Sequence, residues 1–166
     1  CDFVIFDPLK GMFVIEVKGG GVSHDPQLGP DWYSIDRFGN KHQIKDPFKQ
    51  SETYRFKILR QVKEKVRGLK NTQIPVGHSV ALPDISKNSL GGIIAHNRPR
   101  EIIACKEDLM NLNRWYQKSS DFWMKHDGFE PIGKQALNEI ERVFLGPVHV
   151  RPSLRAAMDL EEENRI

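Results

Sequence analysis

Two short runs of β-branched and aromatic residues, separated by a tight turn, constrain the fold of this chain more than any other feature. Residues 2–5 and 12–17 are rich in Val, Ile and Phe. The segment between them, residues 7–11, contains Asp, Pro and Gly, which are residues that turns favour. This arrangement predicts an antiparallel β-hairpin at the start of the sequence.

The predicted hairpin carries two acids and a lysine. Side chains two residues apart in a strand point to the same face, so Glu16 and Lys18 share one face of the second strand. Pairing of the two strands brings Asp2 beside Glu16. Two carboxylates and a backbone carbonyl, here that of Val17, are oxygen ligands of the kind that Mg²⁺ prefers. Lys18 would then orient or deprotonate an attacking water, or stabilise the charge that develops on a phosphate.

The rest of the sequence predicts a mixed α/β domain. The chain has 166 residues, of which 39% are hydrophobic, and this is enough for one domain with its own core. No GxGxxG follows the first strand, and no GxxxxGK followed by Ser or Thr is present, which argues against Rossmann and P-loop folds. After the hairpin we expect a small hairpin over 32–35 and 42–44, followed by a helix from Pro47 to about Leu69 that Asp46 caps. We then expect a strand over 74–82 and a further strand over 91–95 or 102–105. Three more helices are expected over 108–115, 122–125 and 134–145.

A second signal lies on the long predicted helix. Gln50 and Tyr54 form a QxxxY string, which would place a polar side chain beside the two carboxylates. The opposite face of the helix is basic, and such a face can follow the phosphates of a nucleic acid. A solvated helix face carries similar charges, and Glu52 and Glu64 are interleaved with the basic residues. Those basic residues are Arg55, Lys57, Arg60, Lys63, Lys65, Arg67 and Lys70.

The hairpin and the helix together resemble the NERD (nuclease-related) domain, which is similar to the PD-(D/E)xK restriction-endonuclease-like superfamily. The matching pieces are residues 2–5, 13–20, 32 and 46–50, and residues 74–84 and 101–109 resemble the later strands of that family. The resemblance implies a restriction-endonuclease-like fold, in which a mixed β-sheet is flanked by helices. It also implies that Asp2, Glu16 and the Val17 carbonyl hold the metal, that Lys18 is the catalytic lysine, and that Gln50 belongs to the active site. Tyr54 completes the QxxxY string seen in RecB-type nucleases.

The resemblance also bears on what surrounds the domain. Such nucleases often carry an acidic residue on a helix before the first strand, and we expect that helix to be missing here. NERD domains are often fused to helicases, and residues 154–166 resemble the approach to one. We therefore expect a nuclease-like core over 1–127, a C-terminal helix with a linker or docking tail over 128–166, and a fused or associated helicase as a partner.

Several other residues have simpler interpretations. Asp7 is the other candidate for the first acid, but its position in a turn favours a structural role. The string Ser23-His24-Asp25 has the composition of a catalytic triad, yet consecutive residues rarely reach triad geometry. The six histidines lack metal-ligand spacing and are expected in loops or on the surface. Residues expected in the core are Trp32, Trp115, Trp123 and Cys105.

Charge and cysteine content restrict the class of partner and the compartment. The formal net charge of +3 and the pI near 8.9 permit a polyanionic partner. No apolar run is long enough to span a bilayer. We therefore expect no membrane partner. The two cysteines are far apart and lack metal-ligand spacing, so we expect a cytoplasmic protein.

Together these patterns predict a nuclease that hydrolyses phosphodiester bonds in DNA with Mg²⁺ or Mn²⁺. Contacts to phosphate carry no sequence information, so we expect the enzyme to be directed by nucleic-acid structure or strand ends. Two alternatives stay open. One is a non-catalytic nuclease-like module that binds nucleic acid or docks a helicase, and the other is an acid-dependent hydrolase unrelated to nucleic acid.

Overall fold

Two β-sheets and their flanking helices form the part of the chain that the structure describes. The computed structural model describes residues 1–25, 27, 29–92 and 98–145. The larger sheet has the strand order β1-β2-β6-β7, formed by β1 (Phe3–Asp7), β2 (Gly11–Val17), β6 (Val76–Leu82) and β7 (Ile103–Cys105). The first pair is antiparallel and the other two pairs are parallel. The fold class is therefore α/β with a mixed sheet, as the sequence predicts.

The predicted hairpin at the start of the chain is confirmed. Its register pairs Phe3 with Ile15 and Asp7 with Gly11. Gly11 has a φ of +79°, and a Cβ at this position would lie 2.2 Å from the backbone oxygen of Pro75. Only glycine avoids both the positive φ and the steric conflict, so this residue fixes the closed end of the hairpin.

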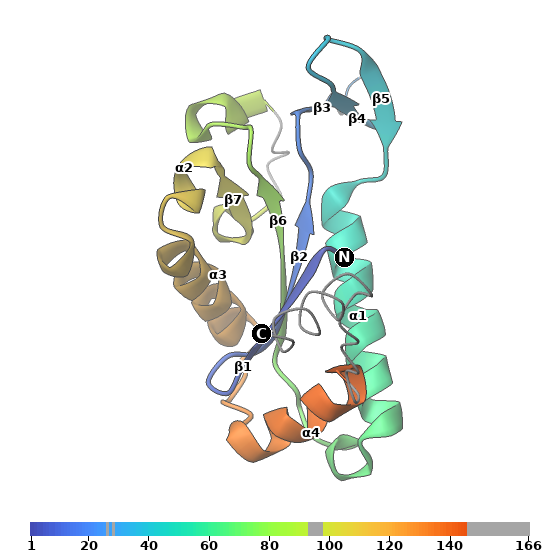
Figure 1. Cartoon of the computed structure of the whole chain (residues 1–166), viewed down its shortest axis with the longest axis vertical. Coiled ribbons are helices and arrows are strands. Elements are labelled where there is room, and N and C mark those ends of the chain that lie inside the picture. Colours follow the sequence, from blue (N-terminus) through green and yellow to red (C-terminus); the bar gives the residue numbers. More distant parts are fainter. Residues whose placement is uncertain (26, 28, 93–97, 146–166) are drawn as a thin grey trace, which may run out of the picture.

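The larger sheet is covered by helices on both faces (Figure 1). Helix α1 (Pro47–Lys65) lies on one face and α3 (Leu112–His126) lies on the other. Alternate residues of β2 enter two hydrophobic clusters, with Val14 in the cluster beneath α1 and Phe13 in the cluster beneath α3. Both faces of β2 are buried as a result, which is typical of a strand inside a sheet with parallel neighbours.

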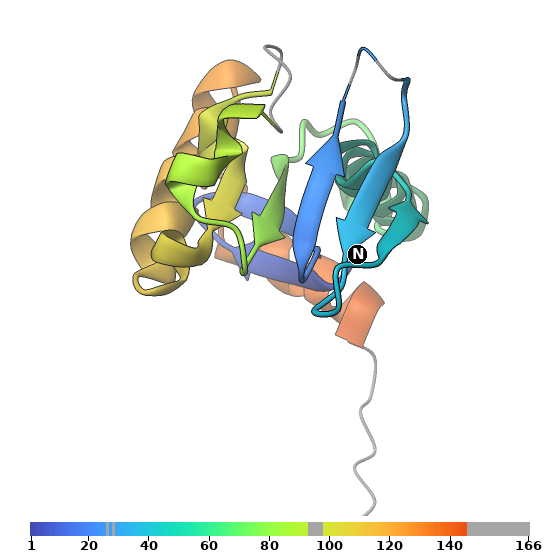
Figure 2. The same cartoon turned by 90° about the horizontal axis from the view of Figure 1, so that it is seen from above.

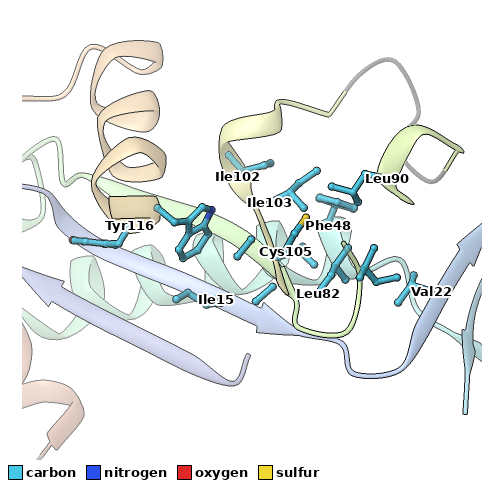
Figure 3. Packing of buried hydrophobic residues seen from close by; sticks show 14 of the residues in the cluster. Ile15, Val22, Phe48, Leu82, Leu90, Ile102, Ile103, Cys105 and Tyr116 are labelled. Carbon is cyan, nitrogen blue, oxygen red and sulfur yellow. The ribbon is translucent and has the colours of Figure 1, made fainter. Parts of the chain in front are cut away.

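The cluster on the α3 side extends to the start of α1. Figure 3 shows Phe48 of α1 packed close to Leu82 of β6 and Cys105 of β7. The tryptophans and Cys105 are buried, as expected from the sequence: Trp32, Trp115, Trp123 and Cys105. This packing anchors the start of α1 at the end of the sheet where β2 and β6 terminate.

A second, three-stranded antiparallel sheet follows the carboxyl end of β2 (Figures 1 and 2). Its strands are β3 (Gly21–His24), β4 (Trp32–Ile35) and β5 (Lys41–Ile44). The hairpin of β4 and β5 is confirmed. Strand β3 is not among the elements expected from the sequence, yet it pairs with β4 along its whole length and buries Val22.

The helices differ from the predicted ones mainly at their ends. Helix α1 begins at Pro47, with Asp46 accepting from the amides of Phe48 and Lys49, and it ends at Lys65 before a short 3-10 turn, Arg67–Leu69. The expected helix over 108–115 is instead the short α2 (Lys106–Leu109) followed by α3, whose N-cap is Asn111. The separate helix expected over 122–125 is the second half of α3.

Helix α4 (Lys134–Leu145) has the predicted bounds. It buries Ile140 against Val14 and Val62 in the cluster beneath α1, so it packs against the sheet and α1. The division into 1–127 and 128–166 stays a prediction, and the tail over 146–166 lies outside the described residues. Of the two candidates for a further strand, 102–105 is close to the observed β7, and most of 91–95 lies outside the described residues.

Short 3-10 turns, Lys87–Gly92 and Arg100–Ile102, complete the described elements. Within residues 1–25, 27, 29–92 and 98–145, no helix combines the length and the apolar character needed to cross a membrane.

Candidate active site

A buried glutamate lies at the open end of the hairpin. Glu16 is the last residue but one of β2 and only 1% exposed. One of its carboxylate oxygens, Oε1, accepts a hydrogen bond from Nζ of Lys18 at 2.7 Å. The other, Oε2, is buried without a hydrogen-bond partner among the described residues. The amino group of Cys1 approaches Oε2 only to 3.7 Å.

Burying this carboxylate is energetically unfavourable for the fold. A charged group taken out of water costs several kcal/mol, and the cost is recovered only when both oxygens find partners. Glu16 has one strong partner in Lys18, and its second oxygen has only the long ion pair with the amino group of Cys1. All other residues of β2 are apolar. Buried polar atoms without a hydrogen-bond partner are rare in native structures. A cation bound at this oxygen would explain its presence here.

Asp2 and Val17 meet at the same end of the hairpin. The amide of Val17 donates to the Asp2 carboxylate at 2.6 Å, so this carboxylate lies beside the residue that follows Glu16. The amide of Lys18 points the other way and donates to the Ala81 carbonyl in β6. Because the N–H and C=O of one strand residue point to the same side, the carbonyl of Val17 also points toward the β1 side, where Asp2 lies.

These groups are candidate ligands of a hard divalent cation. Two carboxylates and one carbonyl supply oxygen ligands only, which Mg²⁺ and Mn²⁺ accept and which leave room for water ligands. The unpartnered Oε2 of Glu16 is the observation that favours such a cation. Within the described residues, no three His, Cys, Asp or Glu side chains converge to hold a metal. Any cation here would therefore rely on two side chains, the Val17 carbonyl, and water.

Gln50 lines a cleft beside the start of α1. The cleft has a volume of about 440 Å³ and lies between α1 and the small sheet. No hydrogen bond joins Gln50 to Asp2, Glu16 or Lys18 among the described residues, so its expected place in the site stays a prediction. The residues that line the cleft are Pro30, Asp31, Trp32, Ile44, Lys45, Asp46, Lys49, Gln50, Thr53, Tyr54 and Lys57.

Three lysines and two aspartates line this cleft, so its formal net charge is +1. Lys45, Lys49 and Lys57 line it, and Nζ of Lys57 lies 5.3 Å from the ring centroid of Tyr54. Tyr54 also packs against the hydrophobic cluster beneath α1. The QxxxY string therefore contributes one polar side chain and one half-buried ring to a basic cleft.

Asp84 is a candidate site residue that sequence reasoning missed. It follows β6 and its carboxylate accepts from the amide of Gly20 at 2.6 Å, two residues after Lys18. Strands β2 and β6 are parallel, so their carboxyl ends lie at the same edge of the sheet. An acid directly after a buried strand is the sequence signal that points to this edge.

A buried Ser–His pair is the second feature that the sequence did not reveal. His78 in β6 lies 3.0 Å from Oγ of Ser51 in α1, and both side chains are buried. Burial, together with the positive charges of Arg55 and Arg98, lowers the pKa of His78 to about 3. The imidazole is therefore neutral at physiological pH. The expectation of a loop or surface position is wrong for His78.

The His78 pair is a structural network. Ser51 also donates to the carbonyl of Phe48 at 2.9 Å, and Nε1 of Trp123 donates to the carbonyl of His78 at 2.8 Å. Arg55 lies over the ring of Trp123 and pairs with Asp127. The side chains of this network have hydrogen-bond or ion-pair partners inside the fold, whereas Oε2 of Glu16 has no hydrogen-bond partner among the described residues.

The simpler interpretations of the remaining residues hold. Asp7 accepts from the amides of Leu9 and Lys10 and from the hydroxyl of Tyr116, so it is a structural turn residue. His24 stacks on Trp32 at 4.5 Å, and its Nδ1 donates to the carbonyl of Asp31. Ser23-His24-Asp25 therefore forms part of a strand and its exit, without triad contacts.

Comparison of the chain with models of protein families, with curated protein sequences and with solved structures gives no match. The resemblance to the NERD domain therefore stays a prediction from the sequence.

Proposed function

We propose that this protein is a nuclease that hydrolyses phosphodiester bonds in DNA with Mg²⁺ or Mn²⁺. The observation that carries the proposal is the buried carboxylate of Glu16, which has one oxygen on Lys18 and the other without a hydrogen-bond partner. Asp2 and the Val17 carbonyl lie at the same end of the hairpin. Ligands of α/β sheets bind at the carboxyl ends of parallel strands, and this group lies at that edge.

The residues have distinct roles in this proposal. Asp2, Glu16 and the carbonyl of Val17 would hold the cation. When bound, the cation would lower the pKa of a water and neutralise phosphate charge. Lys18 is held at Glu16 by its hydrogen bond, from where its ammonium orients the attacking water or stabilises negative charge on the phosphate. Gln50 contacts the substrate from the start of α1.

The basic cleft supports a nucleic-acid substrate. Lys45, Lys49 and Lys57 line it, and lysines bind phosphates without reading bases. The enzyme would accordingly recognise the structure or the end of a DNA molecule. Association with a helicase remains a prediction from the sequence resemblance.

A plasmid-nicking assay in Mg²⁺ and Mn²⁺ tests the proposal. We expect Glu16→Gln and Lys18→Met to lower the nicking rate by at least about 100-fold, because each removes a group that acts on transition-state charge. Asp7→Asn is the matched control, since it changes an acid of the same hairpin that is bonded inside the fold. Its nicking rate should stay close to that of the parent. Nicking by Glu16→Gln at the parental rate would refute the assignment.

A non-catalytic module that binds nucleic acid is the second candidate. One observation favours it: Lys18 already neutralises Glu16, while the basic cleft requires no metal to bind phosphate. Titration with Mn²⁺ followed by nicking separates the two. DNA binding without nicking, in the presence of bound metal, would favour the module over the enzyme.

A further inference from the structure

The turn between β4 and β5 is built around Asp36. One oxygen of its carboxylate accepts from the amides of Phe38 and Asn40, at 2.8 and 2.9 Å, and the other accepts from the side chains of Asn40 and His42. The contacts from His42 and Asn40 hold the pKa of Asp36 well below its usual range. Four hydrogen bonds to one carboxylate order a turn that has no core of its own, so Phe38 is held in a defined position.

An aromatic ring and a guanidinium are displayed together on this turn. Phe38 is 75% exposed, and the guanidinium of Arg37 lies 4.8 Å from its ring centroid. Exposure of a phenylalanine is unfavourable in a free protein. The same pair suits a nucleic acid, because a ring stacks on any base and a guanidinium stacks on a base or binds the neighbouring phosphate.

A cleft lies between this turn and the glycines that follow Lys18 in the chain. It has a volume of about 650 Å³ and is lined by the turn and by Gly19, Gly20 and Gly21, the three residues that follow Lys18. Gly20 has a φ of +75°, and a Cβ there would lie 2.6 Å from the carbonyl oxygen of Ile35. Three of the residues that line the cleft therefore have no side chain, which permits close approach of a flat ligand to their backbone.

The charges in the cleft favour a base over a phosphate. Asp36, Asp84 and Arg37 line it, and the two carboxylates outnumber the one guanidinium, so the lining as a whole repels a phosphate group. The lysines, by contrast, line the other cleft, beside Gln50. A strand whose backbone follows the lysine-lined cleft could present an uncharged base to the cleft at Phe38. Stacking requires an exposed base face, which duplex interiors lack and which single strands and frayed ends provide.

We propose that Phe38, supported by Arg37, is the stacking platform for an unpaired base of DNA at the entrance to the cleft beside Lys18. The inference rests on the proposed nuclease function for its ligand, and it names the feature that would direct the enzyme to single strands and strand ends. Phe38 is a binding residue in this proposal and takes no part in bond cleavage.

Binding in EDTA tests the platform independently of cleavage. The probe is a single-stranded DNA oligonucleotide with a fluorescent adenine analogue at one end, and the full chain is titrated into it. We expect the parent to quench the analogue, and Phe38→Leu to weaken binding by about tenfold with loss of the quenching. Phe38→Trp should restore both, because it replaces one stacking ring with another. Binding to a blunt duplex should not change in either variant.

Phe56 provides the matched control. It is another exposed phenylalanine, 55% exposed, with an arginine beside it, but it lies on α1 outside this cleft. Phe56→Leu should keep the quenching. The proposal is overturned if Phe38→Leu quenches like the parent, if Phe56→Leu loses the quenching equally, or if Phe38→Leu weakens duplex binding as much as single-strand binding.

The plasmid-nicking assay keeps the two proposals separate. Quenching that depends on Phe38 without nicking in Mg²⁺ or Mn²⁺ would refute the nuclease and retain the platform. Nicking that depends on Glu16, with binding independent of Phe38, would retain the nuclease and refute the platform.

Discussion

The acidic residues at the two ends of the first hairpin differ in how completely they are hydrogen-bonded. At the closed end, Asp7 bonds two backbone amides and the Tyr116 hydroxyl, and these contacts hold the turn against α3. At the open end, Glu16 is equally part of the strand and more deeply buried, yet one of its oxygens has no hydrogen-bond partner among the described residues. The closed end stabilises the fold, whereas the open end carries polar groups that the fold alone does not need.

This difference in hydrogen bonding distinguishes an acid that stabilises the fold from an acid that we propose has a function. The distinction needs no comparison with related proteins. A buried polar atom with partners contributes to stability, whereas one without partners lowers stability and is retained where it has another use. Both clefts are lined by residues near the open end in the chain or in the proposed site: the glycines that follow Lys18 line one, and Gln50 lines the other. Substitutions at the two ends should therefore change different properties.

The largest effect is expected at the closed end, from Gly11→Ala. A Cβ there meets the Pro75 backbone at 2.2 Å in a backbone conformation with φ of +79°. We expect the free energy of unfolding to fall by about 3 kcal/mol or more. Urea denaturation followed by circular dichroism measures it, with Gly39→Ala as the control. Gly39 also has a positive φ, but its Cβ would meet no atom within 4 Å. An equal loss in both variants would mean that backbone strain, and not the contact with Pro75, fixes this end.

Removing the two acids should change stability in opposite directions. Asp7→Ala leaves two amides and the buried Tyr116 hydroxyl without their acceptor, and should cost about 2 kcal/mol. Glu16→Leu replaces a half-paired buried charge with an apolar group of similar size, and should gain about 1 kcal/mol. Lys18 can turn to water, since its side chain is 22% exposed. Urea denaturation of both variants measures these changes. An equal loss of stability in Glu16→Leu and in Asp7→Ala would contradict the predicted difference between the two acids.

His78 lies opposite Val14, between the two ends, and its pH dependence should resemble that of a structural group. Its folded pKa is about 3 against 6.5 for the free side chain, so below pH 6.5 the unfolded chain binds a proton that the folded chain does not. Stability should therefore fall with falling pH, by about 2 kcal/mol between pH 6.5 and 5. We expect His78→Asn to flatten the profile over this range in urea denaturation. An unchanged profile would mean that other groups cause the loss.

The sequence predicted the features that local patterns determine. The hairpin followed from two apolar runs and a turn, α1 from the Asp46-Pro47 cap, and the structural role of Asp7 from its place in that turn. The pairing of Glu16 with Lys18 followed from their spacing of two residues in a strand. In each case the interacting residues are close in the sequence, so a short window contains both partners.

The features that could not be predicted from the sequence depend on partners that are far apart in the chain. His78 is buried because Ser51 of α1 and Trp123 of α3 contact it, and the packing of both helices on β6, which pairs in parallel with β2, brings them together. Asp84 reaches Gly20 through the same pairing. The sequence does not predict strand β3, because its glycine favours a turn, and pairing with β4 overrides that preference. The cleft at Phe38 exists only once the small sheet is placed beside Gly19.

Calorimetric titration of the metal-free protein with Mn²⁺ tests the metal site at the open end most directly. We predict saturable binding to the parent, no measurable binding to Glu16→Gln, and parental binding to Asp7→Asn. Absence of Mn²⁺ binding in the parent, or equal binding to the parent and Glu16→Gln, would contradict the assignment of the open end of the hairpin as a metal site.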